Sequence, residues 1–232
     1  MSSDRSPGES AIALVVRRSP RAKRMRLKVD ARTGSVLLTV PRRVSERRAL
    51  DWASEQRPWI EAALAALPEA APVAPGGSVP LYGEPHVIDW REGLPRTVCV
   101  EPGRIVTGGP AETLAPRLLR WLRAHAGEIL AQETRACAAR AEVEVARVAV
   151  GDPVSRWGSC SASGAIRYSW RLILAPEWVR RATVAHEVAH RVHMHHGPAF
   201  HALVAELLDA DPGPARRWLR RHGASLHRFG GL

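Results

Sequence analysis

The chain has 232 residues, 45% hydrophobic and 25% charged, which is enough to bury a sizeable core and is ordinary for a globular protein. Its three cysteines are widely spaced and form no C-x-x-C pair, which argues against a disulfide framework and favours a reducing cytoplasm. The formal net charge of +11 comes almost wholly from arginine and admits nucleic acid or a nucleotide as a partner of the basic surface. Because the arginines are spread along the chain, a solvated basic surface is the simpler interpretation.

Residues 1–10 are small and polar, and we expect them to form a disordered tail. They lack the basic start and apolar run of a signal peptide. No later stretch approaches eighteen consecutive apolar residues. We therefore expect a cytoplasmic protein without a membrane partner.

Residues 11–110 are predicted to form an N-terminal β-rich region with a helix. Alternating apolar residues predict three strands, which we expect to pair as a small antiparallel sheet: 11–16, 25–29 and 36–40. A helix is predicted from about Glu46 to Leu67, with Ser45 as its cap and Pro58 kinking or splitting it. Residues 68–77, rich in proline, alanine and glycine, are the best candidate for a linker. Short strands should follow at 81–82, 86–90, 97–100 and 104–107.

Residues 111–232 are predicted to form the second domain. Their patterns indicate a long helix at 112–141, a strand at 145–150 and two strands within 155–175. Helices should follow from residue 176, at 199–208 and at 215–221. Strands followed by a helix that carries H-E-x-x-H are the plan of zincin peptidases. We therefore expect an α+β fold, with a zincin-like catalytic domain of mixed sheet and metal-binding helix after an N-terminal antiparallel β/α region.

The motif itself is His186-Glu187-Val188-Ala189-His190. Two histidines four residues apart on a helix lie about 40° apart around its axis, so both imidazoles can reach one metal ion. Glu187 is placed to hold a water molecule on that metal and to take its proton. The pattern predicts a zinc site, and Gly197-Pro198 should end the helix.

A catalytic zinc ion needs a third protein ligand. The downstream candidates are His193, His195, His196, His201 and Glu206. His193 lies seven residues after His186, which is a rise of about 10.5 Å along a helix. The two rings therefore cannot share one metal ion while His190 also binds it. On an unbroken helix His196 would point about 240° away from His190, so the helix must end first. Geometry alone leaves both His195 and His196 open, and Glu206 is the rival from a second helix.

Three residues upstream of the motif are candidates for substrate or oxyanion contact. Arg156 and Arg171 could stabilise an oxyanion or a phosphate, and Gly158 could let a substrate approach the backbone. The alternative is structural: the arginines pair with carboxylates and the glycine forms a bulge.

Several motifs, in the same order and spacing, resemble the YgjP-like metallopeptidase family, which is related to the SprT-like and M48-type zinc peptidases. They are Ser155 to Ser161 (SRWGSCS), Trp170 to Pro176 (WRLILAP), the H-E-x-x-H motif, and His196 before Gly197-Pro198-Ala199-Phe200. The basic segment 17–24 and the segment 40–45 resemble the opening of that family. The resemblance implies His186, His190 and His196 as zinc ligands and Glu187 as the catalytic base. His195 and His201 depart from the family pattern, which usually has asparagine and an aromatic residue there.

The leading hypothesis is therefore a zinc-dependent metallopeptidase that acts on a peptide or protein substrate. One alternative keeps the Zn2+ ion but makes the enzyme a nucleotide pyrophosphatase or phosphoesterase. Another is a nucleic-acid-associated protease whose basic strands and 17–24 turn hold DNA or RNA.

Overall fold

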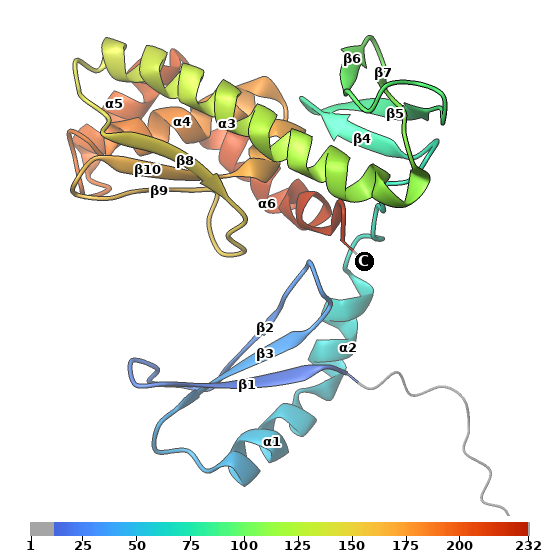
Figure 1. Ribbon diagram of the computed structural model, residues 1–232. Helices are drawn as coiled ribbons and strands as arrows, with labels where there is room; N and C mark the ends of the chain where they lie inside the picture. Colours follow the sequence, from blue (N-terminus) through green and yellow to red (C-terminus); the bar gives the residue numbers. More distant parts are fainter. Residues whose placement is uncertain (1–11, 232) are drawn as a thin grey trace, which may run out of the picture. The chain divides into compact units, whose positions relative to one another are not determined.

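A computed structural model of the protein describes residues 12–231, so the predicted tail at residues 1–10 lies outside the described part. The chain divides into two compact units, Met1–Pro68 and Glu69–Leu232 (Figure 1). The fold is α+β with mixed sheets, as the sequence predicts. We placed the domain boundary at residue 110, whereas the units divide at the start of the candidate linker, so residues 69–110 group with the C-terminal unit.

The N-terminal unit is a three-stranded sheet followed by two helices. Its strands are β1 (Leu14–Ser19), β2 (Arg26–Val29) and β3 (Val36–Pro41), in the order β1-β3-β2. β2 is antiparallel to β3, but β1 is parallel to it, so our expectation of an antiparallel sheet is wrong. β1 and β2 do not pair with each other, because β3 lies between them in the sheet.

The predicted helix of this unit is split, as its proline requires. α1 (Glu46–Glu55) begins after Ser45, whose side-chain oxygen accepts a hydrogen bond from the backbone N–H of Arg48. α2 (Arg57–Ala65) begins at once, with Pro58 in its first turn, where a missing N–H costs nothing. Buried residues of β3 and α1 then form the small core of this unit: Leu38, Val40, Ala49 and Ala53.

The C-terminal unit contains two further sheets. The first has the order β4-β5-β7-β6, from strands β4 (Ser78–Leu81), β5 (Glu84–Trp90), β6 (Cys99–Glu101) and β7 (Arg104–Thr107). The second has the order β8-β10-β9, from β8 (Arg147–Gly151), β9 (Gly158–Cys160) and β10 (Ala165–Ser169). β9 lies at the edge and is antiparallel to β10, whereas β8 is parallel to it.

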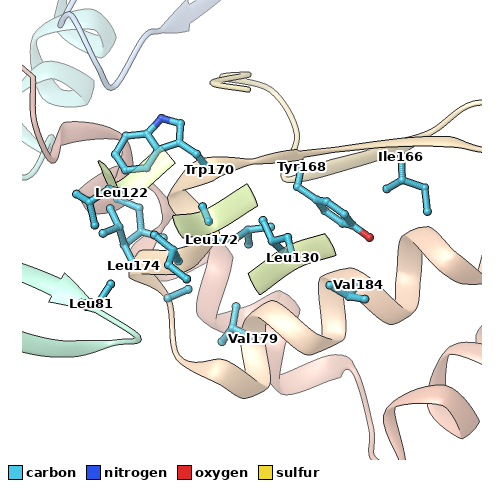
Figure 2. Close-up of a cluster of buried hydrophobic side chains, with 14 of the residues drawn as sticks. Leu81, Leu122, Leu130, Ile166, Tyr168, Trp170, Leu172, Leu174, Val179 and Val184 are labelled. Carbon is cyan, nitrogen blue, oxygen red and sulfur yellow. The ribbon is translucent and has the colours of Figure 1, made fainter. Parts of the chain in front are cut away.

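The long helix α3 (Leu114–Arg140) follows a short 3-10 turn, Ala111–Thr113, and runs along the C-terminal unit between the two sheets (Figure 1). Its buried residues recur every four positions and form one stripe: Leu114, Leu118, Leu122, Ala126, Leu130 and Thr134. They pack against the buried 3-10 segment Trp170–Leu174 (Figure 2). Burying each leucine contributes about 1.5–3 kcal/mol, so this stripe is a large part of the core that holds the site.

Three helices complete the unit: α4 (Glu177–Ala189), α5 (Pro198–Leu208) and α6 (Gly213–Arg228). α4 packs against α3, α5 and α6 and is largely buried. Because the H-E-x-x-H motif lies at the end of α4, the core fixes its position from several sides.

Candidate metal centre

The structure brings three histidines of the predicted site together. His186 lies in the last turn of α4, His190 is the residue that ends that helix, and His196 comes from the following segment. Their candidate ligand atoms all lie within 4.8 Å of one another. The Nε2 atoms of His186 and His196 are 3.2 Å apart. Three imidazole nitrogens that converge in this way can hold one transition-metal ion.

The chain turns sharply between the second and third histidines. The N–H of His193 donates to the carbonyl of Ala189 at 2.9 Å, and α4 does not continue beyond that point. We expected Gly197-Pro198 to end this helix, but these residues begin α5 instead, with the proline in its first turn. The early end of α4 removes the angular problem that an unbroken helix would give His196.

The same turn orients the ring of His190. Its Nδ1 atom lies 3.1 Å from the carbonyl oxygen of His193, which can only accept, so Nδ1 carries the proton. The Nε2 lone pair is then available to a metal ion. A backbone carbonyl from the loop therefore sets the tautomer of this histidine.

Phe200 of α5 supports all three imidazoles. Its fully buried ring has centroid distances of 4.9 Å to His186, 4.6 Å to His190 and 4.7 Å to His196. Although the resemblance quoted above includes this residue, the sequence did not reveal its role. Its position four residues after His196, on a helix that opens with Pro198, is the signal that could have shown it.

Burial favours the uncharged form of two of the histidines. Burial, followed by the charges of the neighbouring histidines and Arg216, lowers the pKa of His186 to about 4. Burial also lowers the pKa of His190. A neutral imidazole has a free lone pair, so the chemistry of this donor set fits a metal ion.

Glu187 lies beside the histidines with only 5% of its surface exposed. Burial raises the pKa of its carboxyl to about 7, and the positive charge of Arg156 opposes that shift. A Cβ atom placed on Gly158 would lie 2.5 Å from Oε1 and 2.6 Å from Cγ of this side chain. The edge strand β9 can therefore approach the carboxylate only because residue 158 is glycine.

The two candidate arginines lie in different surroundings. Arg171 is buried, its guanidinium paired with Asp152 at 2.8 Å and donating to the carbonyls of Leu226 and Phe229 at 2.6 and 2.7 Å. These contacts give Arg171 a structural role, and it does not line the cavity beside the histidines. Arg156 is exposed and does line that cavity.

The cavity itself has a volume of about 250 Å³ and opens beside His186 and Glu187. Its apolar wall is formed by side chains from the β9 approach and from α4, α5 and α6: Trp157, Ala182, Val204, Pro212, Ala215 and Leu219. Arg216 of α6 also lines it, with a guanidinium nitrogen 3.5 Å from Nδ1 of His201. No motif in the sequence separates Arg216 from the four other arginines on α6, so sequence reasoning missed it.

The remaining candidate ligands lie outside the cluster. His193 contributes its backbone, not its ring, and His195 is exposed. The His201 ring stacks on His196 at a centroid distance of 6.3 Å. Glu206 is exposed on α5, and its backbone carbonyl accepts a hydrogen bond from Arg140.

A family model described as YgjP-like, metallopeptidase domain matches residues 23–222 of the chain. The chain belongs to the YgjP-like family. Membership confirms the resemblance carried by the motifs, identifies the protein with a metallopeptidase group and implies a metal ion. Comparisons with curated proteins and with solved structures give no match. Within the YgjP-like match, the His186–His190–His196 cluster is the one group of three or more potential metal ligands among the described residues.

The helices of residues 12–231 include none with the length and apolar character needed to cross a membrane.

Proposed function

We propose that the protein is a zinc-dependent peptidase whose metal is held by His186, His190 and His196. The observation that supports this most directly is the convergence of three imidazole nitrogens beside one buried carboxyl group. Zinc bound in this way supplies Lewis acidity, which acidifies water and polarises a carbonyl group. Imidazole donors suit several divalent metals, so zinc itself remains part of the proposal.

Glu187 is the general base of the proposed reaction. Its carboxylate takes a proton from the attacking water, whose oxygen forms a bond to the carbonyl carbon of the substrate. The C–N bond then breaks, and Glu187 passes the proton to the leaving amine. A base with a pKa near the working pH can perform both transfers, and burial places this carboxyl in that range in the metal-free protein.

The edge strand β9 supports a peptide as the substrate. β9 pairs with β10 on one side and has no strand on the other among the described residues. An extended peptide could add to this free edge through main-chain hydrogen bonds. Gly158 on β9 would then present the peptide next to Glu187.

The test combines metal analysis with one conservative substitution. Glu187→Gln should keep about one zinc ion per chain and lose turnover of a broad peptide library, because the amide cannot accept the proton. His195→Ala is the matched control and should keep both metal and activity, since its ring is outside the cluster. Full peptidase activity in Glu187→Gln would refute the assignment.

A phosphoesterase remains the rival for the same metal site, because two arginines line the cavity beside it. Arginine binds phosphate oxygens in bidentate fashion. Incubating the metal-loaded enzyme with nucleotides and, in a parallel reaction, with unfolded protein distinguishes the two chemistries. Release of phosphate or pyrophosphate without peptide cleavage would replace the peptidase proposal.

We also propose the N-terminal unit as the contact for any polyanionic partner. Residues 12–68 contain 13 Lys and Arg against five Asp and Glu, a net charge of +8 out of +11 for the chain. Register places Arg17 and Arg26 on either side of Thr39, on the sheet face opposite the buried Leu38 and Val40. Binding of single-stranded DNA that weakens steeply with salt, and weakens further in an Arg17→Ala/Arg26→Ala protein, would support this role. Unchanged affinity in that protein would contradict it.

A further inference from the structure

The cavity beside the metal site combines an apolar wall with two cationic side chains. Arg156 enters from the segment before β9, and Arg216 enters from the first turn of α6. Among the described residues neither guanidinium forms an ion pair with a carboxylate, and a guanidinium nitrogen of Arg216 lies 3.5 Å from the imidazole of His201. A cavity of this composition suits a ligand that has both an apolar and an anionic part.

Both arginines line the same cavity as His186 and Glu187, the groups at which the proposed cleavage takes place. An anion bound by these guanidinium groups would therefore lie in the cavity that opens beside the metal site.

The volume limits what can enter. Pockets that enclose a whole small molecule measure about 300–1,000 Å³, so a cavity of about 250 Å³ suits one side chain with the groups next to it. The last residue of a peptide supplies both required parts at once, because its apolar side chain and its own carboxylate share one Cα atom. An acidic side chain would need a second residue to fill the apolar wall.

We propose that the cavity binds the C-terminal residue of the substrate, with an apolar side chain against Trp157, Val204 and Leu219 and the terminal carboxylate held by Arg156 and Arg216. The inference rests on the proposed peptidase function. It makes the enzyme a carboxypeptidase, which releases the last residue of a chain. Water adds to the carbonyl carbon of the preceding residue, the bond from that carbon to the nitrogen of the last residue breaks, and the proton from Glu187 goes to that nitrogen. The last residue then leaves as a free amino acid.

Binding to the zinc-loaded Glu187→Gln protein tests this without turnover. The probes are an N-acetylated tetrapeptide ending in leucine, the same peptide as its C-terminal amide, and an amide with aspartate before the leucine. We expect the free acid to bind at least about tenfold more tightly than the amide, because a charge-assisted hydrogen bond contributes about that factor. Calorimetry gives the dissociation constants, and cleavage of the same peptides by the wild-type enzyme gives an independent measurement.

Variants identify the residues responsible. Arg216→Ala should remove the preference for the acid, and Arg216→Lys should restore part of it, because lysine keeps the charge but not the bidentate geometry. Arg156→Ala should weaken the acid in the same direction. Arg220→Ala is the matched control: it lies on the same helix, is exposed and does not line the cavity, so the preference should be unchanged.

Three outcomes would overturn the inference. Equal binding of acid and amide, with peptide cleavage intact, would remove the C-terminal assignment and leave the peptidase function standing. Preference for the aspartate amide, lost in Arg216→Ala, would assign the arginines to an acidic side chain within the substrate. No cleavage of any peptide by the wild-type enzyme would remove the peptidase function and this inference together.

Discussion

Replacing Gly158 with alanine should disable the enzyme by displacing its base. The new methyl group would lie 2.5 Å from Oε1, 2.6 Å from Cγ and 2.7 Å from Cδ of Glu187. Non-bonded carbon atoms are best separated by about 3.5–4.0 Å, so the carboxylate must move by about 1 Å. Because a misplacement of about 1 Å can cost about 100-fold in rate, we expect kcat/KM to fall by about that factor.

The fold and the metal should tolerate the same change. Gly158 does not have the left-handed backbone that would itself resist alanine. The clash is with a single buried side chain, so the free energy of unfolding should fall by about 1–3 kcal/mol, as for other overpacked sites. The three histidines are not touched, and zinc content should equal that of the wild type. Denaturant unfolding and metal analysis check both expectations.

A double-mutant cycle isolates the cause. If Gly158→Ala acts through Glu187, adding it to Glu187→Gln should reduce kcat/KM little further. Gly151→Ala is the matched control, because its methyl group would meet the exposed side chain of Arg167 and not the base. Activity should then be near normal. Wild-type turnover in a folded, zinc-loaded Gly158→Ala protein would refute the close approach of strand and base.

Three further predictions concern metal, stability and pH. His196→Ala should weaken zinc binding by more than about 100-fold, beyond what loss of a supporting residue costs, while His195→Ala leaves affinity unchanged in a chelator competition. Arg171→Met should lower the free energy of unfolding by about 3 kcal/mol in denaturant titrations, because the hydrogen bonds from Arg171 to Asp152 and to two carbonyls are lost, without changing zinc affinity. In metal-free protein the raised pKa of Glu187 means that the folded state binds more protons than the unfolded state between about pH 4.5 and 7. Its contribution to stability therefore falls as pH rises through that window, and Glu187→Gln should gain up to roughly 3 kcal/mol relative to wild type by pH 8. A pH-independent difference would contradict the burial of this carboxyl.

The sequence predicted what depends on local chemistry. The cap at Ser45, the break caused by Pro58 and the helical spacing of His186 and His190 each follow from a few neighbouring residues, and the structure contains all three features. The parallel pairing of β1 with β3 could not be predicted in this way. The pairing depends on β3 lying between β1 and β2 in the sheet. Alternation of apolar residues is the same in parallel and antiparallel strands, so it does not predict the strand direction.

The site residues also differ in how far the sequence could predict them. Helix geometry identified two candidate ligands and a base, but the third ligand needed the family spacing, because geometry alone left both His195 and His196 open. The end of α4 was also predicted at the wrong residues. Gly197-Pro198 is a strong breaker pattern, yet it is equally a pattern for the start of a helix, and here it begins α5. The cavity arginines were harder still. Arg156 is 60 residues from Arg216 along the chain, and only the packing of α6 beside α4 brings them to one cavity.

The cluster of imidazoles lowers the stability of the metal-free protein in acid, and this supports a metal-binding role. Three rings with centroids about 5 Å apart, resting on a buried phenylalanine, cannot all become protonated without strong mutual repulsion. In the metal-free protein the lowered pKa of His186 therefore favours unfolding as pH falls from about 6.5 toward 4, since the unfolded chain then binds the extra proton. A divalent ion reverses the balance, because it binds the neutral rings that burial already favours. These histidines destabilise the metal-free protein in acid and favour metal binding at neutral pH. Both effects are expected of a metal site, whereas apolar side chains would pack the core without the loss of stability in acid.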